Sequence, residues 1–376
     1  MELSRRQRRA LEAICDTFVP AADGLPSATA AGVPDALLQA LDRAPRDADR
    51  RALAQLLSVW DVQRFNGASQ ERRERILRRW ADSPVPQMRA AFQALRKGAT
   101  VTYYAGAPEA WAAIGYPGPL GVREDAPPRA LAPVSVTTPT ELSCDVVIVG
   151  SGAGGGTAAA VLADAGLDVV VLEAGEYYDD ADFDGGEAQA FERMYLDGGA
   201  GVTSDGGVGL LAGACLGGGT VINYTTSFRT PDAVRAEWAG HGLPELASET
   251  YAASLDAVCA RLGVTFEYST PGTRDEVMAR GLDALGWHVD AMPRNVRGCD
   301  QGVDCGRCGF GCRLGAKQSV VKTWLADASA AGARLLVGVR ASRVLVSGGS
   351  ARGVEAVSAS GHRVVVRSRA VVAAAG

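Results

Sequence analysis

The stretch from Cys144 to Gly175 reads CDVVIVGSGAGGGTAAAVLADAGLDVVVLEAG and limits the possible folds more than any other part of the chain. An apolar strand, a helix opened by glycines and a second apolar strand follow one another with only short turns between them. This order is the pattern of a βαβ unit, whose two strands lie parallel in one sheet with the helix packed over them. The region from residue 144 onward is therefore predicted to have an α/β fold.

The turn after the first of these strands predicts a dinucleotide site. Its sequence GSGAGG fits G-x-G-x-x-G. Gly150 permits the tight turn, Gly152 lets the backbone approach a pyrophosphate, and Gly155 lets the helix pack closely on the strand. The carboxylate of Glu173 ends the second strand, where it can accept hydrogen bonds from ribose hydroxyls, and it favours FAD or NAD over NADP. The predicted cofactor-binding residues are Gly150, Ser151, Gly152, Ala153, Gly155, Glu173 and Ala174.

A second glycine-rich segment, LAGACLGGGTVIN, runs from residue 211 to residue 223. Several glycines before a short apolar turn suggest a backbone that lies against a flat ring system, because glycine leaves room for a close approach. Composition alone leaves an ordinary flexible loop as the alternative. The residues assigned to cofactor contact in this segment are Gly213, Gly217, Gly218, Thr220 and Asn223.

The two ends of the chain differ in composition and periodicity, which predicts that they form separate units. Residues 1–115 are rich in Arg and show a helical period, so they are expected to form a small all-α unit. Residues 116–143 are rich in Pro and Gly and are interpreted as a linker. Residues 144–376 are predicted to be the dinucleotide-binding domain, with short strands from residue 334 onward.

Helical periodicity also predicts which apolar residues are buried. A helix over 4–19 should bury Leu11, Ile14, Cys15 and Phe18. Helices over 248–262 and 273–286 are expected to turn their apolar residues inward. These residues are Leu255, Val258, Cys259 and Leu262 in the first, and Val277, Met278, Leu282 and Leu285 in the second.

Composition and charge exclude some classes of protein. A net charge of −5, with arginines spread among acids, argues against nucleic-acid binding. No run of about 18 uncharged apolar residues is present, and no signal peptide is recognised, so a cytoplasmic location is expected. The segment ERRERILRRW leaves peripheral membrane contact open, although a solvated helix face is the favoured interpretation.

The two glycine motifs together resemble the glucose–methanol–choline (GMC) family of FAD oxidoreductases. The segment GACLGGGTVINYTTSFRTP is similar to the family's second signature, from which it departs mildly at Gly219 and Thr220. The resemblance implies FAD as the cofactor, a Rossmann-like FAD-binding domain, and adenine contact near Ala341. The N-terminal helices and the segment around residues 292–328 resemble the long-chain (fatty) alcohol oxidase branch. Those helices also resemble the small subunit of flavin-dependent gluconate and glucose dehydrogenases.

The resemblance implies oxidation of a hydrophobic primary alcohol to the aldehyde, by hydride transfer to flavin N5, with O2 or another acceptor taking the electrons. Family members carry the proton acceptor in their C-terminal third, so it is expected downstream of Gly376, and the chain is expected to be truncated. The three histidines, His241, His288 and His362, are interpreted as surface or capping residues. Two alternatives stay open: a sugar or polyol dehydrogenase that uses an iron–sulfur cluster, and a catalytically incomplete flavin-binding fragment.

Half of the eight cysteines lie between residues 299 and 312, with the spacing C-x5-C-x2-C-x3-C. Four thiolates would satisfy the tetrahedral coordination of zinc, whereas the irregular spacing is better tolerated by iron–sulfur ligation. A structural loop without any ligand is the third interpretation. The sequence leaves these three open for Cys299, Cys305, Cys308 and Cys312.

Overall fold

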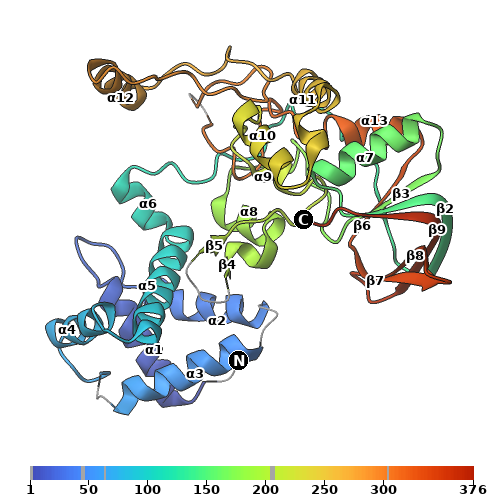
Figure 1. Cartoon of the computed structure of the whole chain (residues 1–376). Helices are drawn as coiled ribbons and strands as arrows, with labels where there is room; N and C mark the ends of the chain where they lie inside the picture. The colour runs from blue at the N-terminus through green and yellow to red at the C-terminus, as the bar shows by residue number, and fades with distance from the viewer. Residues whose placement is uncertain (1–2, 44–46, 63–64, 204–207, 303–304) are drawn as a thin grey trace. The chain divides into compact units, whose positions relative to one another are not determined.

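The computed structural model describes residues 3–43, 47–62, 65–203, 208–302 and 305–376. The chain divides into two compact units (Figure 1). The first consists of Met1–Gly118 with Ala200–Leu210, and the second of Pro119–Gly199 with Leu211–Gly376.

The first unit is helical. Its helices are α1 (Arg5–Phe18), α2 (Val33–Arg43), α3 (Asp47–Val62), α4 (Gln70–Ala81), α5 (Pro86–Gly106) and α6 (Pro108–Ile114). A short antiparallel pair, β4 (Gly201–Val202) with β5 (Gly209–Leu210), also belongs to it. Helix α1 begins in a capping box in which Ser4 and Gln7 bond each other's backbone N–H groups.

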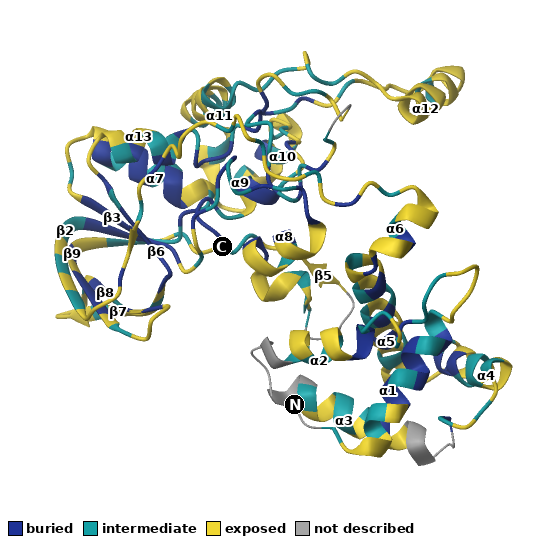
Figure 2. Ribbon diagram, turned by 180° about the vertical axis from the view of Figure 1, so that it is seen from behind, coloured by how far each residue is buried: buried dark blue, intermediate teal, exposed yellow. Residues whose placement is uncertain are grey.

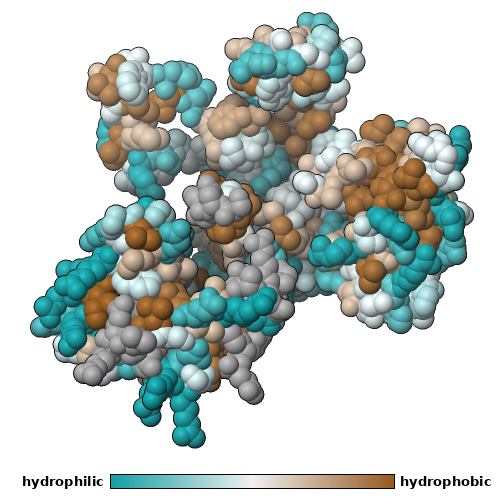
Figure 3. All heavy atoms as spheres, turned by 60° about the horizontal axis from the view of Figure 1, so that its bottom comes forward, coloured by the Kyte–Doolittle hydropathy of each residue, from teal (hydrophilic) through white to brown (hydrophobic). Residues whose placement is uncertain are grey.

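The core of this unit forms around α1, as its helical period predicts. Leu11, Ile14 and Cys15 are buried, and Phe18 packs against the same cluster. The arginines of α1 and α4 lie mostly outside the core, and hydrophilic side chains cover much of the surface of this unit (Figure 3). Among the helices that the structure describes, none is long and apolar enough to cross a membrane.

The second unit is built on a seven-stranded sheet with the order β1-β6-β3-β2-β9-β8-β7. Its strands are β1 (Val134–Ser135), β2 (Thr140–Val149), β3 (Val169–Leu172), β6 (Arg334–Val337), β7 (Val339–Ser347), β8 (Ser350–Ser358) and β9 (Arg363–Ala373). The first five in this order are parallel, and β8 and β7 continue the sheet antiparallel. The predicted α/β fold class is confirmed.

Buried residues lie along the strands of this sheet (Figure 2), and they belong to two core clusters, one on each face. On one face, Ile148 and Val171 belong to a core shared with α7 (Ala153–Asp164) and α13 (Trp324–Ala330). On the other face, Val147 and Val170 join the core formed with β7, β8 and β9. Because both faces are covered, β3 is a continuous apolar strand, as the sequence VVVL predicts.

The remaining helices lie in the connections of this unit. They are α8 (Glu187–Met194), η1 (Leu196–Gly199), α9 (Gly219–Ile222), α10 (Asp232–Gly240), η2 (Pro244–Ala247), α11 (Glu249–Leu262) and α12 (Thr273–Ala284). Helices α11 and α12 form where their periodicity predicts. The prediction that their apolar residues are buried is wrong for both helices, because neither has a buried residue. In α11, Leu255, Cys259 and Leu262 are half-buried and Val258 is exposed.

The physical reason is that periodicity shows which residues share a face of a helix, but not whether another element covers that face. Helix α12 stands at the tip of a long connection, away from the sheet (Figure 1). Val277, Met278 and Leu285 are consequently between 55% and 66% exposed.

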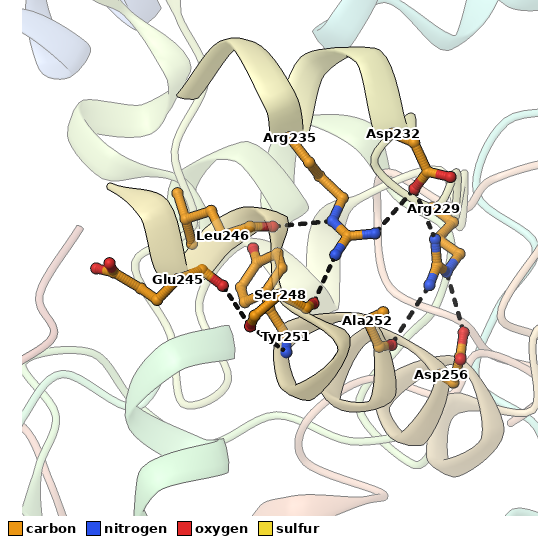
Figure 4. A network of polar contacts seen from close by, with 9 residues as sticks. All are labelled: Arg229, Asp232, Arg235, Glu245, Leu246, Ser248, Tyr251, Ala252 and Asp256. Carbon is orange, nitrogen blue, oxygen red and sulfur yellow. Dashed lines mark hydrogen bonds and ion pairs between the residues drawn. The ribbon is translucent and has the colours of Figure 1, made fainter. Parts of the chain in front are cut away.

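One buried guanidinium joins α10, η2 and α11 (Figure 4). Arg235 donates hydrogen bonds to the carbonyl oxygens of Leu246 at 2.9 Å and Ser248 at 2.8 Å, and it pairs with Asp232. Ser248 in turn caps α11 by accepting the N–H of Tyr251. Arg235 thus satisfies carbonyl groups in the connection between α10 and α11.

We expect Arg235→Met to lower the free energy of unfolding by about 2–4 kcal/mol, because it leaves two carbonyl groups without a donor. Arg229→Met is the matched control. Arg229 pairs with Asp256 on the exposed side of the same network, so its loss should change stability by less than about 1 kcal/mol. Urea denaturation measures both, and equal effects of the two substitutions would contradict this assignment.

Candidate functional site

The turn between β2 and α7 has the conformation that its glycines predict. Gly150 has φ +95°, and a Cβ there would lie 2.5 Å from the carbonyl oxygen of Ala374. A Cβ on Gly155 would lie 2.0 Å from the carbonyl oxygen of Gly150, so α7 can start this close to β2 only with glycine. Gly152, the N-cap of α7, has open space beside it, which leaves the backbone accessible to a ligand.

A further glycine, Gly156, has a role that the motif did not predict. A Cβ at this position would lie 2.3 Å from a methyl group of Val320, so Gly156 allows α7 to pack against the segment that leads into α13. The triple glycine GGG in the sequence was the available signal, but its third member falls outside G-x-G-x-x-G.

Glu173 lies at the carboxyl end of β3, beside the turn that follows β2. Its carboxylate is buried and accepts hydrogen bonds from the N–H of Ser151 at 3.2 Å, from the hydroxyl of Ser151 at 2.5 Å and from the N–H of Gly175 at 2.8 Å. The carboxyl ends of parallel strands are where open α/β sheets bind ligands. Ala174, the next residue, is exposed.

The second glycine segment packs directly against the first. Gly217 and Gly218 have positive φ, and a Cβ on Gly218 would lie 3.2 Å from the Cα of Gly152. A Cβ on Gly213 would overlap the backbone of Gly218. Sequence reasoning assigned these glycines to contact with a ring, and the structure shows that they also allow the backbone of the two loops to meet.

Ser151 connects the two loops. Its hydroxyl donates to Glu173 and accepts the N–H of Gly217 at 2.9 Å, and the residue is fully buried. One side chain therefore orders the first loop, the carboxylate after β3 and the second loop together. The sequence placed Ser151 among the cofactor-binding residues, but not as this connection.

The second loop continues into the short helix α9. The Thr220 hydroxyl donates to the carbonyl of Gly217 at 2.7 Å and accepts the N–H of Val320 at 3.1 Å. The Asn223 side chain accepts the N–H of Thr225 at 3.1 Å. Ala341, half-buried on β7, packs on the core cluster that contains Leu172. It lies in the sheet and not in either glycine loop.

The three histidines lie outside the glycine loops. His241 follows α10 and is 74% exposed, with Glu237 at 3.9 Å. His288 is exposed in the connection after α12, and His362 lies in the hairpin between β8 and β9.

The four clustered cysteines carry free thiols. Arg294 Nη2 lies 3.6 Å from Cys299 Sγ and 3.9 Å from Cys308 Sγ. Burial raises the pKa of the thiols of Cys305 and Cys308, so both are protonated at neutral pH. In the ranges that the structure describes, no three His, Cys, Asp or Glu side chains converge as ligands of a metal ion.

Three protein families match parts of this chain. Residues 191–376 match the GMC oxidoreductase family, and residues 145–192 match a family described as FAD binding domain. Residues 5–118 match the family described as gluconate 2-dehydrogenase subunit 3.

Two long-chain-alcohol oxidases of Arabidopsis thaliana are similar in sequence. FAO4B is 41% identical over 62% of this chain and 33% of its own length, and FAO4A is 31% identical over 97% of this chain and 63% of its own. The chain thus spans less than two thirds of either relative. A solved structure of formate oxidase from Aspergillus oryzae aligns with 64% of this chain and 46% of its own, at 15% identity and a TM-score of 0.44.

These matches include both glycine loops and the strands that carry them. The description of the family that matches residues 145–192 names FAD, and the carboxylate at the end of β3 favours FAD or NAD over NADP. The chain belongs to the GMC oxidoreductase family, uses FAD as its cofactor, and resembles the long-chain-alcohol oxidases among the members of that family.

Proposed function

We propose that this chain is the FAD-binding part of an oxidoreductase that converts a long-chain primary alcohol to its aldehyde, with O2 or another acceptor taking the electrons. The observation that carries the proposal is the contact between the two glycine loops, joined through Ser151 to the carboxylate at the end of β3. The substrate class is supported by the 41% and 31% identity to two long-chain-alcohol oxidases.

Each part of the loops has a proposed task. The backbone of Gly150–Gly155 faces the pyrophosphate, and Glu173 holds the adenosine ribose. The segment Gly217–Asn223 lies along the flavin, with Gly213 behind it, and Ala341 and Ala174 border the adenosine side. When bound, FAD supplies the acceptor for the hydride of the alcohol.

The proton of the alcohol requires a base, which we place outside residues 1–376. The three histidines of the chain are distant from the loops in sequence and lie on other elements. This placement makes the chain by itself a flavin-binding protein with little or no turnover.

A sugar or polyol dehydrogenase is the second candidate, favoured by the match of residues 5–118 to gluconate 2-dehydrogenase subunit 3. Electron transfer through the cysteine loop would require an iron–sulfur cluster. Iron analysis and the visible spectrum after removal of FAD distinguish the two, since a cluster keeps its absorbance when the flavin has gone.

We expect Glu173→Gln to weaken FAD binding by about 10- to 100-fold, because an amide cannot accept from Ser151 and Gly175 and also from a ribose hydroxyl as a carboxylate does. Glu176→Gln makes the same chemical change on an exposed side chain and should leave binding unchanged. Quenching of flavin fluorescence measures the affinity. An unchanged affinity in Glu173→Gln would remove the carboxylate from the site.

Ser151→Ala should both weaken FAD binding and lower stability by about 1–3 kcal/mol, because the N–H of Gly217 loses its acceptor. Thr157→Ala, which removes a hydroxyl from the outer side of α7, is the control and should be nearly neutral. Thermal unfolding with and without FAD separates the two effects. A loss of stability with normal FAD affinity would make Ser151 purely structural.

The substrate class is tested on the chain loaded with FAD under anaerobic conditions. A long-chain primary alcohol should perturb the visible spectrum of the flavin, and a sugar at equal concentration should not. Neither should bleach the flavin rapidly, because the base lies elsewhere. The opposite preference would favour the sugar dehydrogenase, and rapid bleaching by the alcohol would place the base inside residues 1–376.

A further inference from the structure

Lys317 is a buried cation that the proposed mechanism does not use. Its side chain is 3% exposed, and its Nζ donates to the carbonyl oxygens of Val221 at 2.7 Å, Asn223 at 2.6 Å and Cys308 at 2.7 Å. Within the described parts of the chain, no carboxylate lies within ion-pair distance of it. A buried ammonium without an anion is costly, since carbonyl groups replace its hydration without neutralising its charge.

A nearby lysine shows how the charge of an ammonium group is usually neutralised inside a protein. Lys322, in the same segment, pairs with the carboxylate of the buried Asp180 and also donates to the carbonyl of Gly315. The two lysines therefore differ in their charge partner: the charge of Lys322, whose side chain is 23% exposed, is neutralised within the protein, and that of the more deeply buried Lys317 is not.

The position of Lys317 connects it with the second glycine loop. Val221 and Asn223 belong to α9 and its C-cap, directly after Gly217 and Gly218. Three residues beyond Lys317, the N–H of Val320 bonds the hydroxyl of Thr220. Lys317 and Val320 thus bond α9 and its C-cap, while Gly218 of the same loop lies against Gly152.

We propose that Lys317 positions the second glycine loop for FAD and that the anionic cofactor supplies the negative charge that this buried ammonium lacks. The proposal rests on the proposed function of that loop. It makes FAD binding and the protonation of Lys317 mutually dependent, because an anion stabilises the ammonium and the ammonium favours the anion.

Burial lowers the pKa of Lys317 to about 8. The titratable groups that face it are the thiols of Cys215, Cys305, Cys308 and Cys312. Burial raises the pKa of Cys215 to about 12 and raises those of Cys305 and Cys308, so these three thiols carry no charge near pH 8. The guanidinium of Arg294 lies near the sulfur atoms of Cys299 and Cys308.

The sign of the pH effect follows from these groups. In the free protein the ammonium of Lys317 loses its proton near pH 8, and bound FAD raises this pKa. Between the two values FAD binding takes up a proton, so affinity is full below about pH 8 and falls as the pH rises, by up to about tenfold per pH unit.

The experiment compares FAD affinity from about pH 7 to about pH 9.5 in four proteins: wild type, Lys317→Met, Lys317→Arg and Lys322→Met. Wild type should lose affinity above about pH 8. Lys317→Arg, which keeps its charge, should remain flat over this range, and Lys317→Met should bind more weakly than wild type at pH 7 with no such decline. Lys322→Met, which lacks contact with the loop, should be less stable yet follow the wild-type profile.

A second measurement does not depend on FAD. In the free protein, the amides of Gly217–Asn223 should exchange with deuterium faster in Lys317→Met than in wild type or Lys322→Met at the same pH. The proposal is overturned if Lys317→Met shows the amide exchange and the pH profile of FAD affinity of the wild type. It is also overturned if FAD affinity of Lys317→Arg still declines above about pH 8. If Glu173→Gln lowers FAD affinity while the Lys317 variants behave as wild type, only this inference fails. If neither Glu173→Gln nor the Lys317 variants change FAD affinity, the assignment of the glycine loops to FAD binding also fails.

Discussion

The hydroxyl of Ser151 is the interaction on which the arrangement of the site depends. It donates to the carboxylate of Glu173 and accepts the N–H of Gly217, so residues that follow β2 and β3 and a loop far along the chain share one buried group. A hydroxyl suits this place because it can donate and accept at the same time. The two parallel strands bring Ser151 and Glu173 together, and the serine then brings in the second loop.

The conformation of the first glycine loop could be predicted because it depends on residues that are close together in the sequence. The tight turn at Gly150 and the contact of Gly155 with the carbonyl of Gly150 involve residues only a few positions apart, so a short motif records them. The parallel sheet was predictable for a similar reason, since β3 is buried on both faces and leaves a run of apolar residues in the sequence. The fold of residues 144–175 follows from these two signals.

The rest of the site depends on contacts between residues far apart in the chain, and the sequence leaves no comparable record of them. Gly156 is required by Val320, and the ammonium of Lys317 by carbonyl groups nearly a hundred residues earlier. A lysine in a segment with arginines and cysteines has no feature that marks it as buried. The same limit explains α12, whose period predicted a helix correctly and its burial incorrectly, because no neighbour covers it.

Lys317 also contacts both the cysteine loop and the second glycine loop. One ammonium bonds the carbonyl groups of Cys308 and Asn223, so it joins the two loops through their backbones. The N–H of Lys317 bonds the sulfur of Cys312 at 3.3 Å, which fixes the far end of the cysteine loop on the same residue. Lys317 thus joins the cysteine loop to the second glycine loop through two backbone carbonyl groups and the sulfur of Cys312.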